Sequence, residues 1–350
     1  MGRRRAMRTD PQDGAILLFV LLVLAMLVPV AILSTRTVQV DLSGSSRLRN
    51  GVQAESLALS GIRMVHWALA RDLEKDTERA VFVDHVGEDW ASFFDSEGRG
   101  AGGFETGEVA GRIVDEQSRF PINRLLDGNG TVRPEYEQTL RNLLEGPLFE
   151  LEPEAAGELI ASIADWMDDD SDLRSENSAE EEQYREAGVM CGPRNAPFMS
   201  LDELRLVYGM TDDVFNGRDG MPGLKDLVTT AIFDMVNINS ADIFVLQAMA
   251  RDIPQDTALE VARAMVAFRV DPWHHDFLDR GDWYREVAVD GAGFVSFPLG
   301  GTSTSLFRAE VEGRVGGVSR RALGLFSRAN RYGEDVSDAD VVELDRLELQ

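Results

Sequence analysis

Acidic side chains gather in one stretch of this sequence, IADWMDDDSDLRSENSAEEEQY, which spans residues 163–184. Nine carboxylates lie from Asp165 to Glu182, and Arg174 is the one basic residue among them. Calcium takes up oxygen ligands of this kind, about six to eight at a time and at flexible geometry, so the stretch could hold Ca²⁺. The spacing does not match an EF-hand loop. A solvated acidic loop without any ion explains the same residues.

Other residue patterns give no support to an enzyme. His274 and His275 are adjacent, and neighbouring side chains on a helix diverge by about 100°, so this pair is a poor metal chelate. Gly98, Gly100 and Gly103 match the dinucleotide pattern G-x-G-x-x-G, but strand-like sequence follows where a helix should open, which predicts a flexible loop. The sequence holds no P-loop, no G-x-S-x-G and no H-E-x-x-H motif. We therefore predict a protein without catalytic activity.

The charge of the chain argues against nucleic acid as a partner. The formal net charge is −26, and such a surface repels nucleic acid and attracts cations. The stretch VNINSADIFVLQAM, residues 236–249, resembles the opening of a helix–hairpin–helix. The following ARDIPQDTA lacks the glycines that would present backbone N–H groups to phosphate, so a structural helix pair is favoured. Cys191 is the only cysteine, and no internal disulfide can form.

A membrane helix is predicted near the N-terminus. The apolar run from Ala15 to Leu33 has 19 residues, which is close to the ~20 that cross a bilayer core. A secretory signal needs only about 7–15 apolar residues and a small-x-small cleavage site, which is missing here. Arginines at positions 3, 4, 5 and 8 place the N-terminus in the cytoplasm and the rest of the chain outside. A cut after Gly14 would free Ala15 and leave the whole apolar helix attached.

The remaining pattern predicts a long helix, a small sheet and a helical block. Apolar residues continue at helical spacing to Leu73, so residues 15–75 read as one helix, with a break possible at 36–47. Strand-like sequence occupies residues 80–120 and 285–328. Ser240 and Asp256 are the expected caps of two of the helices between these regions. Those predicted helices cover residues 134–145, 153–168, 200–208, 222–235, 240–250 and 255–269.

Five sequence elements, taken in order, resemble the type II secretion minor pseudopilin K family. They are the basic leader with Gly14 and AILLFVLLVLAM, then IVDEQSRFPINRLL, DWMDDDSDLRSENSAEEEQY, NAPFMSLDELRLVYGM and VNINSADIFVLQAM. The resemblance implies an α+β fold in which a transmembrane, pilin-like long helix carries a small antiparallel sheet and a large all-α domain is inserted. The expected boundaries are 1–14 for a cleaved leader, 15–35 for the transmembrane helix, 36–120 and 285–350 for the pilin-like part, and 121–284 for the inserted domain.

The resemblance also implies a set of functional residues. It places a structural Ca²⁺ ion on Asp168, Asp170, Asp172, Glu180 and Glu181. It makes Gly14 and Ala15 the two sides of a cut by prepilin peptidase, which keeps the membrane helix on the product. Phe19 stands where most pilin-like subunits have a glutamate that is thought to pair with the free amine of the subunit above. A subunit without that carboxylate suits the tip of a filament.

The expected function is therefore that of a tip subunit in the periplasm. It would cross the inner membrane once and help to start pseudopilus assembly and protein export across the outer membrane. Its expected partners are the other minor pseudopilins of the tip complex, the major pseudopilin and prepilin peptidase, with no nucleic acid. One alternative is a membrane-anchored periplasmic calcium-binding protein outside any filament. A helix–hairpin–helix module for DNA uptake is a further alternative.

Overall fold

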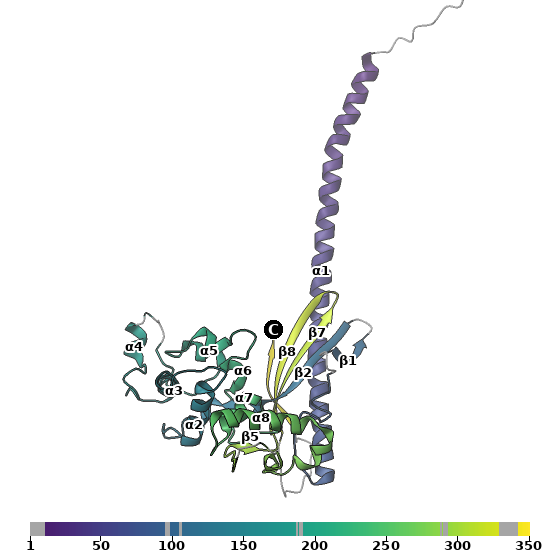
Figure 1. The fold of residues 1–350 in the computed structure, drawn as a ribbon. Coiled ribbons are helices and arrows are strands. Elements are labelled where there is room, and N and C mark those ends of the chain that lie inside the picture. Colours follow the sequence, from purple (N-terminus) through teal and green to yellow (C-terminus); the bar gives the residue numbers. More distant parts are fainter. Residues whose placement is uncertain are drawn as a thin grey trace, which may run out of the picture.

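One continuous helix dominates the computed structural model, which describes residues 11–94, 99–104, 107–186, 188, 192–287, 289, 293–328 and 342–350. Helix α1 runs over Pro11–Arg79, 69 residues, and its N-terminal half stands clear of the rest of the molecule (Figure 1). The helix does not break at residues 36–47, although Gly44 lies there. Ala15–Ser34 is long and apolar enough to cross a membrane.

An antiparallel sheet packs beside the C-terminal half of α1, with the strand order β1-β2-β7-β8-β9. Its strands are β1 (Arg99–Phe104), β2 (Gly107–Asp115), β7 (Leu306–Val315), β8 (Val318–Arg328) and β9 (Val342–Leu349). Alternate residues of β7 are buried, as expected for a sheet with one covered face. Strand β2 pairs directly with β7, so Arg112 and Glu310, 198 residues apart in the sequence, lie side by side.

Small residues let α1 approach the sheet closely. A Cβ atom added at Gly313 of β7 would lie 2.1 Å from the Ala54 carbonyl oxygen of α1. A Cβ at Gly61 would meet the Val311 side chain at 2.4 Å. The larger apolar residues of the same helix face fill the space farther along α1, where Leu69 is fully buried. Helix and sheet therefore form one packed layer pair.

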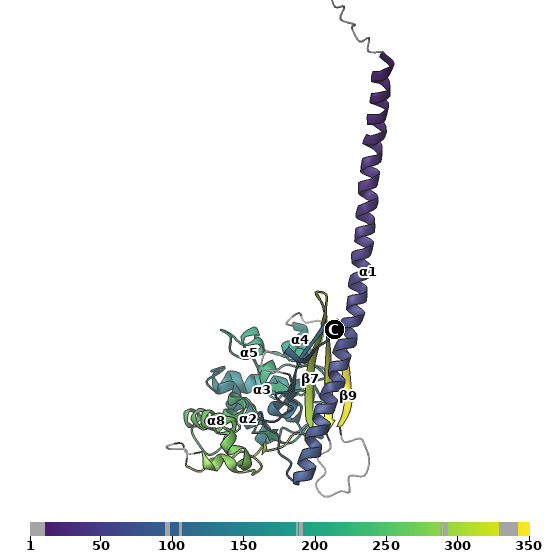
Figure 2. The same cartoon turned by 90° about the vertical axis from the view of Figure 1, so that its right-hand side faces the viewer.

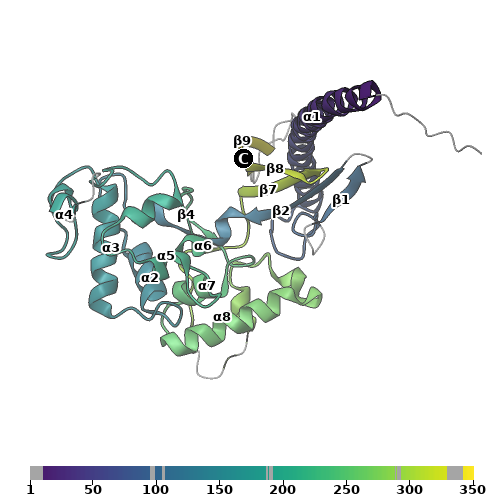
Figure 3. The ribbon, with the colours of Figure 1, turned by 90° about the horizontal axis from the view of Figure 1, so that it is seen from above.

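The chain between β2 and β7 forms a separate helical unit on the side of the sheet away from α1 (Figures 2 and 3). Its α-helices are α2 (Pro134–Glu145), α3 (Pro153–Met167), α4 (Glu181–Glu186), α5 (Asp212–Asn216), α6 (Leu224–Leu227), α7 (Ile243–Met249) and α8 (Gln255–Val270). The described residues of this segment also form the 3-10 helices η1 (Glu116–Ser118), η2 (Ile122–Arg124), η3 (Leu201–Leu206), η4 (Pro272–Phe277) and η5 (Trp283–Glu286). Two short parallel pairs, β3 (Phe120–Pro121) with β4 (Val228–Thr229) and β5 (Val236–Asn237) with β6 (Gly300–Gly301), tie distant segments together.

Buried hydrogen bonds join the helical unit to the end of the sheet. The Asn237 side-chain amide donates to Asp115 Oδ2 at 2.8 Å and to the Asp84 carbonyl oxygen at 2.9 Å. Ser240 also donates to Asp115. This is why Ser240 does not cap a helix as expected. Helix α7 begins later, and Asp242 caps it by accepting from the Phe244 N–H.

Three other local predictions were wrong. The helix expected at 222–235 ends after one turn at Leu227, because β-branched Val228 and Thr229 pair with β3 instead. The helix expected at 200–208 is the 3-10 helix η3. Pro254, not Asp256, precedes α8 as its N-cap.

The strand predictions also need correction. The glycine-rich segment expected as a loop forms β1, and its Gly103 pairs with Glu108 of β2. The described residues of 285–299, expected as strands, include the end of η5 and pack most of their apolar side chains into the helical unit, whereas Phe294 is exposed. Val295, Phe297 and Leu299 belong to that unit's core. Tertiary packing thus overrides the local β-propensity of this segment.

Candidate metal centre and membrane anchor

The acidic stretch begins at the C-terminal end of α3 and continues to the start of α4. Helix α3 buries Asp165 completely, and Asp168, directly after the helix, is 3% exposed. Glu180, directly before α4, is 5% exposed. Three carboxylates from the two ends of one loop therefore point into the protein, where an ionised group is stable only with a partner.

Two of these carboxylates hold an oxygen without a partner. Asp168 Oδ1 and Glu180 Oε1 are buried and accept no hydrogen bond. Asp165 Oδ1 also accepts none, although the Arg174 Nε lies 3.3 Å away as an ion pair. Buried polar atoms in folded proteins usually have a hydrogen-bond partner. Buried oxygens without one indicate a site that another group completes.

Arg174 is the positive charge that the chain itself supplies to this site. Its guanidinium donates to Asp168 Oδ2, at 2.9 Å from Nε and 2.5 Å from Nη2. It also donates to the Gly130 carbonyl oxygen at 2.7 Å. A single guanidinium faces three buried carboxylates, so negative charge remains in excess.

The pKa values of the three buried carboxylates are raised above their usual values. Burial raises the pKa of Asp165 and of Asp168. Burial and the neighbouring charges of Asp165, Asp168 and Asp170 raise the pKa of Glu180 to about 7. Like charges that cannot all ionise together are stabilised either by protons or by a cation.

The residues implied by the family resemblance divide into two groups. Asp168 and Glu180 lie inside, whereas Asp170, Asp172 and Glu181 are exposed. Asp170 Oδ1 accepts from the Asp172 N–H at 2.8 Å, which turns the loop at that point. No three acidic oxygens of the stretch converge within 4.8 Å among the described residues.

Asp165 was not among the ligands expected from the sequence, yet it lies deepest in the site. The signal was present in the pattern. Asp165 interrupts the apolar face of α3, three positions after the buried Ser162, where an unpaired charge would be costly. A carboxylate on a buried helix face that also begins an acidic stretch is a stronger ligand candidate than one in the exposed loop.

Aromatic packing holds both ends of the acidic stretch. The Trp166 ring stacks on Phe198 with centroids 6.1 Å apart, and meets Tyr184 edge-on at 5.9 Å. The Tyr184 hydroxyl accepts from the Tyr208 N–H at 2.9 Å. The inward carboxylates are therefore fixed by a rigid frame. Cys191, which follows this frame, lies outside the described residues.

These residues fit a bound calcium ion. The donor set is entirely oxygen, with orphaned buried atoms on Asp168 and Glu180. Because no three of these carboxylate oxygens lie within 4.8 Å of one another among the described residues, the exposed loop carboxylates would have to move inward to complete the site. Asp165, Asp168 and Glu180 would hold the ion from inside, and Asp170 from the loop. The chemistry such an ion supplies is charge neutralisation and cross-linking of α3 to α4.

The predicted anchor residues lie on the free part of α1. Ala15 begins the membrane-length segment, and Phe19, one turn later, is 67% exposed. Gly14 belongs to the same helix. Beyond the span, Leu48 and Val52 are exposed, although their spacing grouped them with the buried residues that face the sheet. Their exposure leaves two apolar side chains on the surface of α1, next to Asn50 and Gly51, which already approach the end of the sheet at β7 and β8.

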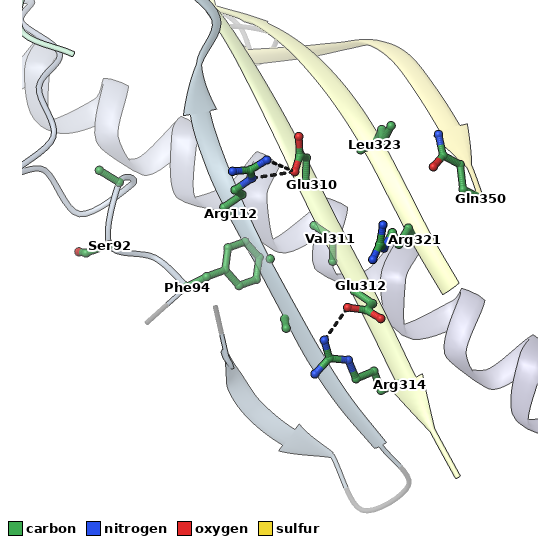
Figure 4. A pocket seen from close by; sticks show the side chains of 13 residues that line it. Ser92, Phe94, Arg112, Glu310, Val311, Glu312, Arg314, Arg321, Leu323 and Gln350 are labelled. Carbon is green, nitrogen blue, oxygen red and sulfur yellow. Dashed lines mark hydrogen bonds and ion pairs between the residues drawn. The ribbon is translucent and has the colours of Figure 1, made fainter. Parts of the chain in front are cut away.

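A groove of about 900 Å³ lies over the sheet face opposite α1 (Figure 4). Arg112 pairs with Glu310 at 2.6 Å, and Arg314 pairs with Glu312 at 2.6 Å. Phe94 forms part of the wall, and its ring approaches Gly111 closely. Because Arg112 is paired with Glu310 across β2 and β7, and Arg314 with Glu312 within β7, the groove has the character of a contact surface and not of a reaction site.

Comparisons with known proteins agree with this architecture. A family model described as type II secretion system (T2SS), protein K matches residues 118–217. Type II secretion system protein K of Pseudomonas aeruginosa is 31% identical over 239 residues, which are 68% of each chain. The protein of that name from Pectobacterium carotovorum is 29% identical over 266 residues, 74% of this chain and 75% of the relative.

A solved structure shares the fold. It is described as the crystal structure of the GspK-GspI-GspJ complex from the enterotoxigenic Escherichia coli type 2 secretion system. The TM-score is 0.57 at 18% identity, and the match covers 89% of this chain and 98% of the solved one. At that identity the likeness speaks for the fold: a long helix, a small sheet and an inserted helical unit.

Proposed function

The chain belongs to the type II secretion system protein K family, and from this premise we propose that it is a minor pseudopilin at the tip of the pseudopilus. In this role it starts assembly of the filament together with other minor pseudopilins, and so promotes protein export across the outer membrane. It is anchored in the inner membrane by Ala15–Ser34, with the sheet and the helical unit in the periplasm.

The single observation that carries the proposal is the distribution of mass along α1. The membrane-length segment occupies one end of the helix, and the sheet and the helical unit occupy the other (Figure 1). The helical unit adds bulk beside the sheet at the end farthest from the membrane. A further subunit of the same shape has little room to stack above it, which favours the end of a filament over its shaft.

Phe19 supports the same position. In most pilin-like subunits a glutamate occupies this place, and a carboxylate in hydrocarbon is costly without a partner. A subunit in the shaft finds that partner in the amine of the subunit above. Phe19 needs no such partner, which is appropriate for a subunit with nothing above it.

The apolar face of α1 supplies a surface for neighbouring subunits. Leu48 is 73% exposed and Val52 is 62% exposed, one turn apart on the same helix face. Two exposed apolar side chains one turn apart offer a small contact surface that a neighbouring subunit could cover. The solved relative forms a complex with GspI and GspJ, so proteins corresponding to these are the partners that we propose for this chain.

We further propose that the acidic stretch binds structural Ca²⁺. The orphaned oxygens of Asp168 and Glu180, and the incomplete neutralisation by Arg174, support this role. The ion would hold the loop between α3 and α4 in one conformation in a chain that has no disulfide to do so. Because this site lies in the helical unit, away from α1, we propose that the ion stabilises the helical unit and takes no part in anchoring the chain in the membrane.

Copurification tests the proposed function. The full-length chain is expressed in a bacterium together with the other minor pseudopilins of its secretion system, extracted in detergent and captured. Both partners should be retained, and Leu48→Lys with Val52→Lys should lose them, because two charges would then interrupt the apolar face.

Gln53→Lys with Ser60→Lys is the matched control. Both positions are half-buried on α1, and at 3.6 residues per turn they lie roughly a third of a turn around the helix from Leu48 and Val52. The control adds the same two charges to the same helix and should keep both partners.

Two other outcomes would favour the alternative functions. A wild-type chain that retains no partner but still binds Ca²⁺ would favour a membrane-anchored calcium-binding protein outside any filament. Retention of DNA would favour the helix–hairpin–helix module.

A further inference from the structure

A second group of carboxylates lies where α1 ends. Asp72 belongs to the last turns of α1, and Asp84 and Glu88 belong to the segment that follows it. One carboxylate oxygen from each of the three lies within 4.8 Å of the others. Asp72 and Asp84 are buried, at 5% and 0% exposure. Together with Asp76, described below, these residues are called the junction cluster.

The spacing of the junction cluster suits a cation of calcium's size. Calcium–oxygen distances are about 2.3–2.6 Å, so two ligands on opposite sides of the ion lie up to about 5 Å apart. Three oxygens within 4.8 Å of one another can therefore meet at one Ca²⁺ ion without a large movement of the backbone.

The chain neutralises the junction cluster only in part. Arg328, at the end of β8, donates from Nη1 to Asp72 Oδ2 at 3.0 Å and from Nη2 to Asp84 Oδ1. Lys75 is engaged by the exposed Asp89. Arg79, the last residue of α1, also lines the cavity and lowers the pKa of Asp76. Four carboxylates thus face one fully buried guanidinium and one at the cavity wall, and their negative charge exceeds these two charges by two when all are ionised.

Asp76 is an independent sign that a ligand is missing. This residue is 4% exposed, and its buried Oδ2 accepts no hydrogen bond. It lies one turn after Asp72 on α1, and both line a cavity of about 400 Å³ together with Glu88. Burying a carboxylate oxygen without a donor or a counter-ion is costly, so the position favours a cation in that cavity.

The wall of the cavity holds the Glu88 carboxylate in place. Glu88 Oε2 accepts from the Trp90 indole N–H at 2.8 Å and from the His85 backbone N–H at 3.0 Å. Burial and the charges of Asp72 and Asp84 raise the pKa of Glu88 to about 9 and the pKa of Asp76 to about 7. In the absence of a cation, protons occupy the cluster near neutral pH.

The cluster lies at a meeting point of the fold. Asp72 and Asp76 come from α1, Arg328 from β8, and His275, which also lines the cavity, from η4 of the helical unit. The His85 and His275 rings lie 4.3 Å apart across this boundary. An ion bound here would fix the end of α1 against the segment that leads away from it.

We propose that Asp72, Asp76, Asp84 and Glu88 form a second divalent-cation site, which takes Ca²⁺ and is separate from the acidic stretch of residues 163–184. The site clamps the end of α1 at the junction of the sheet and the helical unit. All the ligands are carboxylate oxygens, and Arg328 remains as a fixed positive neighbour.

Calcium stoichiometry in the full-length, detergent-extracted chain tests the proposal. Asp168→Asn with Glu180→Gln first disables the acidic stretch, and equilibrium dialysis then counts the ions that remain. One Ca²⁺ ion should be retained. Adding Asp76→Asn with Glu88→Gln should weaken its binding at least tenfold. The ion pairs of Arg328 are with Asp72 and Asp84, so these changes leave that pairing intact.

Asp89→Asn is the matched control, because Asp89 is exposed, carries the same charge and lies next to Glu88. It should leave the retained ion in place. Tryptophan fluorescence in the acidic-stretch variant gives a second readout, because the Trp90 indole donates to Glu88. In that variant Ca²⁺ should still change the fluorescence, and the change should disappear when Asp76→Asn and Glu88→Gln are added. No retained ion, or equal retention in this last variant, would overturn the proposal. Zn²⁺ bound in preference to Ca²⁺ and lost in His275→Ala would overturn its ligand assignment.

Discussion

At the scale of single residues, Glu180 links the proposed calcium site of the acidic stretch to pH. Its pKa is raised to about 7 by burial and by neighbouring carboxylates, whereas an unperturbed glutamate has a pKa near 4.3. Between about pH 4 and pH 7, Glu180 is therefore protonated in the metal-free folded protein but ionised in the unfolded chain. Its stability falls as the pH rises through this range.

Calcium binding should show the opposite dependence. The ion needs the ionised carboxylate, so its affinity should fall by up to about tenfold per pH unit below pH 7 and level off above it. Titration calorimetry at pH 6, 7 and 8 measures this effect. Glu180→Gln should flatten the profile, and dissociation constants that agree at pH 6 and pH 8 in the wild-type chain would contradict the assignment.

Thermal melting tests the inward carboxylates of the same site. A tenfold excess of Ca²⁺ over its dissociation constant stabilises a folded protein by about 1.4 kcal/mol. Millimolar Ca²⁺ should raise the melting temperature of the wild-type chain by a few degrees, and Asp168→Asn should remove most of that rise. Mg²⁺ should substitute poorly, because it retains its waters and demands octahedral geometry.

Asp169→Asn is the control for this experiment, because Asp169 is the exposed neighbour of Asp168. It should keep the calcium response. An equal rise with Mg²⁺ and Ca²⁺, or no rise with either, would return residues 163–184 to the solvated acidic loop that the sequence also allows.

Phe19 makes a prediction about assembly at a single position. Phe19→Glu should not improve secretion, because a tip subunit has no amine above it for the carboxylate to pair with. The new charge should instead hinder extraction from the membrane. Secretion of exported proteins by a strain that carries this variant is the measurement, with Phe19→Leu as the apolar control. Secretion above the wild-type level would argue against the tip position.

At the scale of elements, the contact between α1 and β7 depends on the absence of side chains. Gly313→Ala should lower the melting temperature, because its Cβ would lie 2.1 Å from the Ala54 carbonyl oxygen. Overpacking of this kind costs about 1–3 kcal/mol. Gly44→Ala is the control, because it makes the same change at a position inside α1 where the added Cβ would meet no atom within 4 Å. This variant should keep or raise the melting temperature, since alanine favours a helix over glycine. Equal melting temperatures for the two variants would contradict this packing.

The sequence predicted the regular elements better than the short ones. The long helix and α2, α3 and α8 follow from apolar periodicity that persists over several turns. The segment after Leu227 does not, because β-branched residues next to a one-turn helix form their structure from a distant partner, β3. Gly100 and Gly103 read as a loop for a similar reason: only the pairing with β2 makes them a strand.

The candidate sites show the same limit. The sequence located the acidic stretch, because its charges are adjacent. It could not show that Asp165 and Glu180 face inward while Asp172 faces outward, since that depends on the frame around Trp166. The junction cluster was not predicted at all, because Asp72 and Arg328 come together only when α1 packs on β8.

At the scale of the whole molecule, the position of the apolar segment predicts how the mature chain begins. We expect Ala15 as its first residue, because Gly14 directly precedes the membrane-length run. Mass spectrometry of the protein extracted from bacterial membranes measures the N-terminus. Gly14→Asp should block the cut and leave the leader attached. An intact leader on the wild-type chain, or a start beyond residue 34, would contradict the pilin-like interpretation.

The unbroken length of α1 has a mechanical consequence. At about 1.5 Å per residue, the part of α1 from Ser34 to Arg79 is about 68 Å long, and in the proposed membrane topology it would carry the sheet away from the bilayer. A force that pulls along α1 passes to the sheet through the side chains that pack between the helix and strands β7 and β8. Because the force acts parallel to this interface, many contacts resist it at the same time. Asp72 and Asp76 lie in the last turns of this helix and Arg328 of β8 lies beside Asp72, so a cation bound there would stabilise the junction through which the force passes to the helical unit.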